Sequence, residues 1–153
     1  MSSVSIQAVS RTFEGRKGQR TQAMLPVDFE VRDNDFVTIL GPSGCGKSTL
    51  LRIVAGLDHA TSGRVLLDGV PVEGPGADRG MVFQSYTLFP WLTIEQNIRF
   101  GLRERGMPEA QQKERAAYFI AKVGLRGFEQ HFPKQLSGGM QQRTAIARAL
   151  AND

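Results

Sequence analysis

The sequence predicts an α/β fold whose second half is mostly helical, and two observations carry this prediction. Short apolar or alternating runs, typical of β-strands, recur through residues 4–83, and one of them leads through a glycine-rich stretch into a helical pattern. Residues 93–150 instead space their apolar side chains as helices do, with capping signals. We therefore expect an α/β core with a mixed or parallel sheet over residues 1–84 and a helical subdomain over residues 85–153.

Six short runs of the first half are expected to form strands. The first two alternate apolar and polar residues, as half-buried strands do. The run at 36–40 is mostly apolar, which favours a strand buried on both faces of a sheet. Asp68-Gly69 separates two of the runs and favours a tight hairpin turn. The six expected strands are residues 4–9, 24–31, 36–40, 64–67, 70–72 and 81–83.

Four helices are expected, each from a local signal. The first, at residues 47–55, follows the glycine-rich stretch. Residues 93–96 have the spacing of a capping box, in which two side chains each bond the other residue's backbone amide. Pro108 suits the first turn of a third helix, and Gly124 is a natural stop for it. A fourth helical pattern begins after Leu136.

Composition and charge narrow the class of protein only coarsely. The chain has 153 residues, of which 41% are hydrophobic, enough for a buried core. It shows no signal peptide and no apolar run long enough to span a membrane, and its single cysteine, Cys45, has no internal disulfide partner. We therefore expect a cytoplasmic, reduced compartment. The net charge of +4 is compatible with nucleic acid, an anionic nucleotide, an acidic membrane surface or a mildly basic soluble protein.

The glycine-rich stretch, GPSGCGKST, carries the strongest chemical signal of the first half. It matches G-x-x-x-x-G-K-[ST], the P-loop pattern, in which glycines let the backbone wrap an anion with its amides pointing inward. In such a loop Lys47 reaches the β- and γ-phosphates and Ser48 ligates Mg²⁺. The motif by itself does not separate kinases, GTPases and transport ATPases. The predicted nucleotide contacts are Gly41, Pro42, Ser43, Gly44, Cys45, Gly46, Lys47, Ser48 and Thr49.

A second phosphate-facing helix start follows in the second half. In LSGGMQQR, residues 136–143, a serine and two glycines precede a helical pattern, which is how a chain builds an anion-binding helix N-terminus. This motif resembles the signature of ATP-binding cassette (ABC) proteins. Gln84 stands where that family has the glutamine of its Q-loop, and Phe13 stands where it has an aromatic residue that stacks on adenine.

The resemblance implies a homodimer that holds ATP between two cassettes. In ABC proteins two domains pack head to tail, and the P-loop of one and the signature helix of the other enclose one ATP. Gln84 would contact Mg²⁺ or the attacking water, so the implied magnesium ligands are Ser48 and Gln84. The implied catalytic residues are Lys47 and Gln84. The contacts from the signature helix to the γ-phosphate would come from Ser137, Gly138 and Gly139.

A longer match points to the importers within this family. Residues 72–84, VEGPGADRGMVFQ, and the nearby YTLFPWLT look like the ATPases of nitrate, sulfonate and taurine importers. This implies membrane-spanning permease subunits as partners, a periplasmic solute-binding protein as an indirect partner, and a peripheral location on the cytoplasmic face of the membrane. The apolar cluster at 88–91 forms either a small satellite core or a partner surface. The resemblance implies the second, at the groove that receives a helix of the permease. The solute leaves no mark on this sequence, because it contacts other subunits.

Other functions weighed against this one are a DNA-associated ABC ATPase, an ABC translation factor and a non-catalytic module. The first carries a long coiled coil between Q-loop and signature, for which Gln84 and Leu136 stand too close together, so nucleic acid is not expected as a partner. The second carries two cassettes in one chain, which this length does not allow. A non-catalytic nucleotide-binding fragment and a non-transport ABC ATPase remain alternatives.

The end of the chain bears on catalysis. Phosphoryl transfer uses a carboxylate near the metal and a group that positions water. In the family an Asp and a Glu supply these at the end of a strand shortly after the signature helix, whereas this sequence stops at Asp153 with no apolar strand before it. We therefore expect a C-terminally truncated cassette that by itself does not hydrolyse ATP at a useful rate.

Three residues with metal-binding or catalytic potential are set aside. Asp68 follows an apolar run, as a magnesium-binding aspartate would, but it belongs to an expected hairpin turn and precedes the signature. His59 and His131 are lone loop histidines, and the catalytic histidine of the family comes after the signature.

Overall fold

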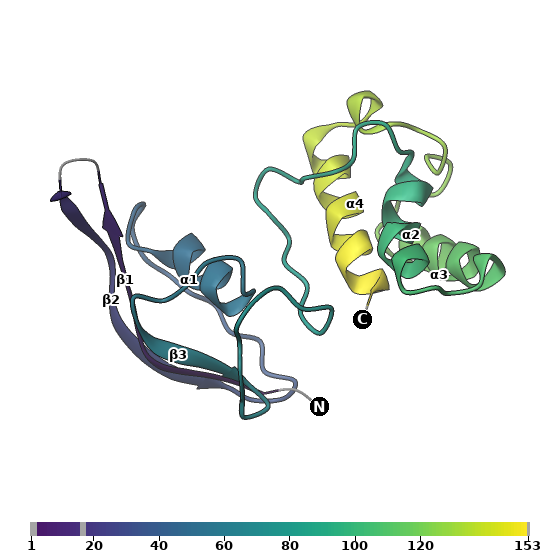
Figure 1. The fold of residues 1–153 in the computed structure, drawn as a ribbon. Coiled ribbons are helices and arrows are strands. Elements are labelled where there is room, and N and C mark those ends of the chain that lie inside the picture. The colour runs from purple at the N-terminus through teal and green to yellow at the C-terminus, as the bar shows by residue number, and fades with distance from the viewer. Residues whose placement is uncertain (1–2, 16–17, 153) are drawn as a thin grey trace. The chain divides into compact units, whose positions relative to one another are not determined.

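The computed structural model describes residues 3–15 and 18–152, so Asp153 lies outside the described residues. Contacts divide the chain into two compact units, one ending at Arg79 and the other beginning at Gly80 (Figure 1). Within the described residues, the first unit holds the sheet and one α-helix, and the second unit holds three α-helices.

The first unit is an antiparallel sheet with a helix packed on it. β1 (Val4–Glu14) and β2 (Arg20–Val31) are long neighbours, and β3 (Ser62–Leu67) and β4 (Val70–Pro71) extend the sheet in the order β2-β1-β3-β4. α1 (Lys47–Val54) lies against this sheet (Figure 1) and buries one apolar stripe on it. The buried core of the unit consists of Ile6, Val9, Met24, Leu50, Ile53 and Val65.

The hairpin between β3 and β4 forms as its sequence predicts. Asp68 has φ 51° and Gly69 has φ 80°, so two successive residues are left-handed. Turns of this kind match the twist of the flanking strands, and Asp-Gly is a favoured pair for them. Leu67 pairs with Val70 directly across the turn.

Two of the six expected strands, residues 36–40 and 81–83, do not form in the described structure. The prediction that the first of them is buried on both faces is wrong, because Phe36 is 96% exposed and Leu40 is 87% exposed. A parallel strand is stable only beside neighbours that complete its hydrogen bonds and under helices that cover its side chains. The described sheet is antiparallel, rather than mixed or parallel, and includes neither segment.

The second unit packs three helices around a core of its own. α2 (Ile94–Glu104) contacts both α3 (Glu109–Lys122) and α4 (Gly138–Ala151), and α3 also contacts α4 (Figure 1). Apolar residues three or four positions apart lie on one face of each helix and supply the core. Its most deeply buried helical members are Ile94, Ile98, Leu102, Ala116, Ile120, Ala147 and Ala151.

The helices begin and end where the local signals place them. The Oγ1 of Thr93 accepts the N–H of Gln96 at 3.3 Å, and the side chain of Gln96 accepts the N–H of Thr93 at 3.0 Å, which completes the capping box of α2. Pro108 immediately precedes α3. Gly124, just beyond the end of α3, is left-handed with φ 68°, a conformation that stops a helix.

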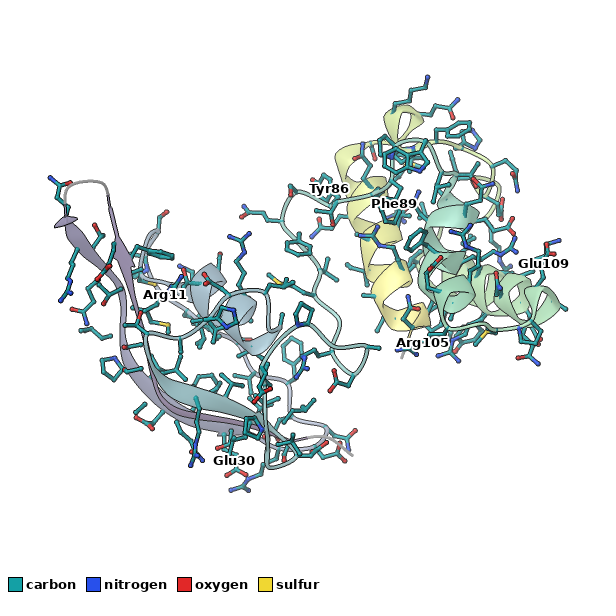
Figure 2. The ribbon with its side chains drawn as sticks, viewed as in Figure 1. Arg11, Glu30, Tyr86, Phe89, Arg105 and Glu109 are labelled. Atoms are coloured by element: carbon teal, nitrogen blue, oxygen red, sulfur yellow. The ribbon has the colours of Figure 1, made fainter. Side chains whose placement is uncertain are left out.

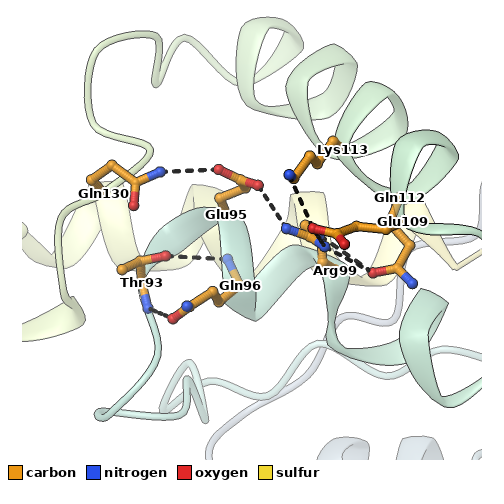
Figure 3. A network of polar contacts seen from close by, with 8 residues as sticks. All are labelled: Thr93, Glu95, Gln96, Arg99, Glu109, Gln112, Lys113 and Gln130. Carbon is orange, nitrogen blue, oxygen red and sulfur yellow. Dashed lines mark hydrogen bonds and ion pairs between the residues drawn. The ribbon is translucent and has the colours of Figure 1, made fainter.

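A polar network joins α2 to α3 (Figure 3). Arg99 lies at its centre and donates to Glu95 at 3.0 Å and to Gln112 at 3.3 Å. Glu109 pairs with Lys113 at 3.0 Å and with Arg99 at 3.4 Å. Lys113 first, and Arg99 second, hold the pKa of the Glu109 carboxyl below its ordinary value by hydrogen bonding and charge. Because the Glu109 side chain is exposed, its ion pairs contribute little to the free energy of unfolding.

Candidate functional site

The glycine-rich loop, residues 41–46, leads directly into α1. Gly46 precedes the helix with φ 94°, a left-handed conformation that favours glycine. A Cβ on Gly46 would lie 2.7 Å from the carbonyl oxygen of Ala23 and 3.1 Å from the Cβ of Met24, both on β2. Position 46 therefore requires glycine for two reasons, the left-handed φ and the close approach of the loop to β2. Together these requirements fix the N-terminus of α1 against the sheet.

Lys47, the first residue of α1, folds its side chain back over this loop. Its Nζ donates to the carbonyl oxygens of Gly41, at 2.8 Å, and Pro42, at 2.7 Å, and lies 3.5 Å from the Sγ of Cys45. The first amides of a helix have no acceptor within the helix. One ammonium and the amides of a helix N-terminus therefore lie at the same loop, an arrangement that favours an anion.

The remaining loop residues leave this site open to solvent. Ser43, Gly44 and Cys45 are exposed, as is Ser48 in the first turn of α1, whereas Thr49 is half-buried. The Ser48 hydroxyl can supply one oxygen ligand to a cation. Among the described residues, no group of three or more His, Cys, Asp or Glu side chains could hold a metal ion. Within the loop and α1, Mg²⁺ would therefore find one side-chain ligand, Ser48, beside nucleotide phosphates and water, which are ligands that Mg²⁺ commonly uses.

Phe13 lies near the end of β1 and belongs to the same unit as the loop. Its side chain is 41% exposed. The guanidinium carbon of Arg11 lies 4.5 Å from the ring centroid, and Arg11 is itself held by an ion pair with Asp58 at 2.8 Å. The ring is thus contacted by a cation and partly open to solvent, so a planar base could stack on it.

The signature segment begins α4 in the second unit. Ser137 is the N-cap, and its Oγ accepts the N–H of Met140 at 3.3 Å. Gly138 and Gly139 are the exposed first residues of the helix, so their amides have no acceptor within it. The Ser137 hydroxyl accepts in the cap, which leaves its proton to donate to an anion. The predicted N-cap is confirmed, and the segment has the chemistry of an anion-binding helix start.

Gln84 is exposed in a turn of the second unit rather than at the end of a formed strand. The N–H of Tyr86 donates to the carbonyl of Phe83 at 3.2 Å, so the chain reverses just after Gln84. The same segment reaches the signature helix, because a Cβ on Gly138 would lie 3.2 Å from the Tyr86 hydroxyl. The structure therefore brings the Gln84 turn and the signature segment together, as neighbours within one unit.

The apolar cluster after Gln84 is anchored to α2. The Phe89 ring centroid lies 4.5 Å from that of Phe100 and 5.6 Å from that of Trp91. Phe89 is half-buried, whereas Trp91 is 69% exposed. One aromatic ring thus fixes the loop and its neighbour faces solvent, so the cluster is part core and part surface.

Asn97, on α2, holds this cluster in place and was not identified from the sequence. Its side chain is fully buried and accepts the N–H of Phe89 at 2.8 Å. It also donates to the carbonyl oxygens of Phe89, Leu92 and Thr93, at 3.2, 3.0 and 3.0 Å. The available signal is its position between Ile94 and Ile98, where a polar residue interrupts an apolar stripe.

The three residues set aside above are engaged locally. The carboxylate of Asp68 accepts the N–H of Ser3 at 2.6 Å. His59 is exposed in a loop. The main-chain carbonyl of His131 accepts the N–H of Ile94 at 3.0 Å, and its ring lies 5.1 Å from that of Phe128. None of the helices in the described part of the chain is long and apolar enough to cross a membrane.

The chain therefore combines a P-loop before α1 with a signature helix, α4, that is capped by Ser137. A sequence profile of the ABC transporter family matches residues 24–153. The chain belongs to the ABC transporter family. This ABC chain is 56% identical to an uncharacterized ABC transporter ATP-binding protein of Methanocaldococcus jannaschii, over 98% of this chain and 56% of that protein.

Relatives with named substrates match this ABC chain over nearly its whole length. It is 48% identical to the nitrate import ATP-binding protein NrtD of Synechocystis, over 97% of this chain and 55% of that protein. It is 49% identical to the taurine import ATP-binding protein TauB of Burkholderia pseudomallei, over 100% of this chain and 58% of that protein. The chain thus spans about half the length of the curated relatives it matches.

Solved structures confirm the fold class. A dimeric post-hydrolysis state of the ATP-binding cassette MJ0796, bound to ADP and Pi, superposes with a TM-score of 0.88 at 36% identity. The match covers 97% of this chain and 69% of that one. A second dimeric structure of the same cassette gives a TM-score of 0.89 at 35% identity, with the same coverage. The predicted α/β P-loop cassette with its helical signature subdomain is therefore confirmed.

Proposed function

We propose that this chain is the ATP-binding part of a subunit that hydrolyses ATP to power an ABC-type solute importer of the nitrate, sulfonate or taurine kind. The observation that carries the proposal is the position of Lys47, whose ammonium lies over the P-loop carbonyls at the N-terminus of α1. The similarity to NrtD and TauB supports an importer, and the dimeric MJ0796 cassette supports pairing of two copies.

In this proposal each ATP lies between two copies of the cassette. Lys47 and the loop amides of one copy bind the β- and γ-phosphates, and Phe13 of that copy stacks on adenine. Ser137 of the second copy donates its hydroxyl proton to the γ-phosphate, together with the amides of Gly138 and Gly139. Neither helix start encloses the phosphates alone, so ATP completes the interface. A two-fold dimer makes two such sites from one pair of surfaces.

Hydrolysis requires charge stabilisation and a positioned water. Lys47 offsets the negative charge that shifts toward the leaving phosphate, and the loop amides hold the β-phosphate in line. Ser48 and Gln84 would hold Mg²⁺, which when bound neutralises phosphate charge. The Gln84 amide would also orient the attacking water by a hydrogen bond. These residues supply neutral oxygens and one cation, so we place the catalytic carboxylates in parts of the protein beyond these residues.

Two candidate functions are distinguished by phosphate release. A non-catalytic nucleotide-binding module is the second candidate, and it is favoured by the lack, among the described residues, of a cluster of acidic or histidine side chains for a metal. We expect the 153-residue chain to bind MgATP weakly without useful turnover. A protein that spans the full length of NrtD or TauB should hydrolyse ATP. Phosphate release should be compared at matched concentrations, and equal turnover by both would contradict this division of the active site.

The partners follow from the same proposal. We place the subunit on the cytoplasmic face of the membrane, bound to permease subunits and linked through them to a solute-binding protein, with no nucleic acid partner. The exposed ring of Trp91 beside the anchored ring of Phe89 is the proposed contact with the permease. Exposed aromatic side chains commonly contribute binding energy at interfaces.

Replacing Phe89 and Trp91 with serine should weaken co-purification with the permease at least tenfold and leave MgATP affinity unchanged. Trp91→Ser alone should have most of this effect without unfolding, because that ring is mostly in solvent. Tyr118→Ser, which removes a 55% exposed aromatic ring from α3, is the matched control and should not affect association. If the Trp91 variant co-purifies normally while the double variant unfolds, the cluster belongs to the core alone.

A further inference from the structure

The turn after Gln84 has an unusual backbone conformation. Tyr86 has φ 61° and Thr87 has φ 45°, so two successive non-glycine residues are left-handed. This is especially unfavourable for Thr87, whose branched Cβ crowds the backbone. The N–H of Thr87 donates to the carbonyl of Ser85 at 2.7 Å, which closes a tight turn. Such strain persists only where the surrounding structure imposes it.

Arg148, on α4, makes the contacts that can impose this conformation. Its Nη1 donates to the carbonyl oxygen of Thr87 at 2.9 Å, and its Nη2 lies 3.2 Å from the Thr87 Oγ1. The same Nη2 lies 3.4 Å from the carbonyl oxygen of Tyr86. The guanidinium carbon is also 5.5 Å from the Phe89 ring centroid. A planar guanidinium presents several donors in a fixed geometry, so one arginine can hold all these acceptors at once.

The turn and the guanidinium stabilise each other. Arg148 is half-buried, and burial lowers the pKa of its guanidinium, although an arginine remains charged at neutral pH. A partly buried charge requires hydrogen-bond acceptors. The two carbonyls supply them only while the turn keeps its left-handed conformation. Arg148 therefore favours the strained turn over the relaxed one.

The same turn also approaches the opposite end of α4. Gly138 is the first residue of the signature helix, and a Cβ added to it would lie 3.2 Å from the Tyr86 hydroxyl. Arg148 stands near the end of that helix. Figure 2 shows Tyr86 and Phe89 beside α4. A short segment that carries Gln84 at one end and the Phe89 cluster at the other is thus tied to both ends of one helix.

We propose that Arg148 is a positioning residue, which clamps the turn at residues 86–87 to α4 and thereby sets where Gln84 and the Phe89–Trp91 cluster stand relative to the signature helix. The functional part of this inference rests on the proposed function, whereas the clamp rests on the contacts alone. When nucleotide binding displaces the N-terminus of α4, the clamp transmits this movement to Gln84 and to the Phe89–Trp91 cluster. Without it, Thr87 relaxes to the negative φ values that a β-branched residue prefers.

Amide hydrogen exchange of the 153-residue chain, followed by NMR, tests the clamp without nucleotide or partner. In Arg148→Ala the amides of Tyr86 and Thr87 should exchange about tenfold faster, because several charge-assisted contacts that oppose local opening are lost. The amide of Phe89, held by Asn97, should change less than about twofold. Unchanged exchange at Tyr86 and Thr87 would overturn the clamp. So would a rise that Phe89 shares equally, because that pattern reports global destabilisation.

Two further variants separate the clamp from a general effect of removing arginine from α4. Arg143 lies on the same helix and donates to the carbonyls of Val123, at 2.8 Å, and Gly124, at 3.4 Å. Arg143→Ala should therefore leave exchange at Tyr86 and Thr87 unchanged. Arg148→Lys keeps the charge but loses the planar group of several donors. The amides of Tyr86 and Thr87 should therefore exchange at a rate between those of wild type and Arg148→Ala. Acceleration by the Arg143 variant equal to that of Arg148→Ala would contradict the assignment.

The functional consequence is tested in the complete transporter. Arg148→Ala should keep the Kd for MgATP within about twofold, because Arg148 is not a phosphate contact, and should lower the kcat of partner-stimulated hydrolysis about tenfold. An unchanged kcat would refute the coupling role. If the wild-type protein binds no MgATP, the proposed function fails, whereas the exchange results still decide on the clamp.

Discussion

Replacing Lys47 with alanine is expected to weaken MgATP binding by one to two orders of magnitude. Its Nζ is held over the P-loop by the carbonyl oxygens of Gly41 and Pro42, at the N-terminus of α1. A charge-assisted hydrogen bond contributes about 1.5–3 kcal/mol, which corresponds to roughly a 10- to 150-fold change in affinity. Isothermal titration calorimetry with MgATP measures this loss directly.

The Lys47 variant should keep its fold. The side chain lies over an open loop and belongs to neither buried core, so circular dichroism and the urea midpoint should hardly change. Lys134→Ala, which removes the same charge from an exposed position in the second unit, is the matched control and should bind MgATP normally. Equal affinity of wild type and Lys47→Ala would refute the assignment of this loop to phosphate.

Replacing Asn97 with leucine should lower the free energy of unfolding of the helical unit by about 2–4 kcal/mol. Leucine has a similar size but cannot pair with the N–H of Phe89 or with the carbonyls of Phe89 and Leu92. Each buried polar group left without a partner costs about 1–3 kcal/mol. The carbonyl of Thr93 loses less, because the backbone N–H of Asn97 still donates to it at 2.8 Å. Urea unfolding followed by circular dichroism measures the difference.

Gln130→Leu is the matched control for Asn97. It also removes a side-chain amide from the second unit, but Gln130 is exposed and donates to Glu95 at 3.0 Å. Losing the Gln130 side-chain amide should change the free energy of unfolding by less than about 0.5 kcal/mol, as is usual for surface substitutions. If the two variants are equally stable, Asn97 does not hold the loop. Asn97→Asp should also destabilise, because a buried carboxylate would face carbonyl oxygens.

The sequence alone determined the local features of the fold, namely the P-loop, the helix starts and the hairpin turn. The glycines of GPSGCGKST and Lys47 specify the loop and the start of α1, because positive φ and a helix start depend on a few consecutive residues. Thr93 with Gln96 specifies the start of α2 in the same way. Asp68-Gly69 specifies a hairpin, because both residues tolerate the left-handed conformation. The P-loop, Gln84 and LSGGMQQR, in this order, were sufficient to identify the family.

Features that depend on which distant segments meet were decided by the tertiary structure alone. Residues 36–40 are apolar enough for a buried strand, but a strand exists only where a neighbouring strand pairs with it, and the described sheet provides none. Arg148 looks in the sequence like any exposed helical arginine. Only the folded chain places it against the carbonyls of Thr87 and Tyr86, which lie 61 and 62 positions earlier in the sequence. Local signals act through the backbone geometry of neighbouring residues. The pairing of strands and the contacts of Arg148 depend instead on how distant segments of a whole unit pack together.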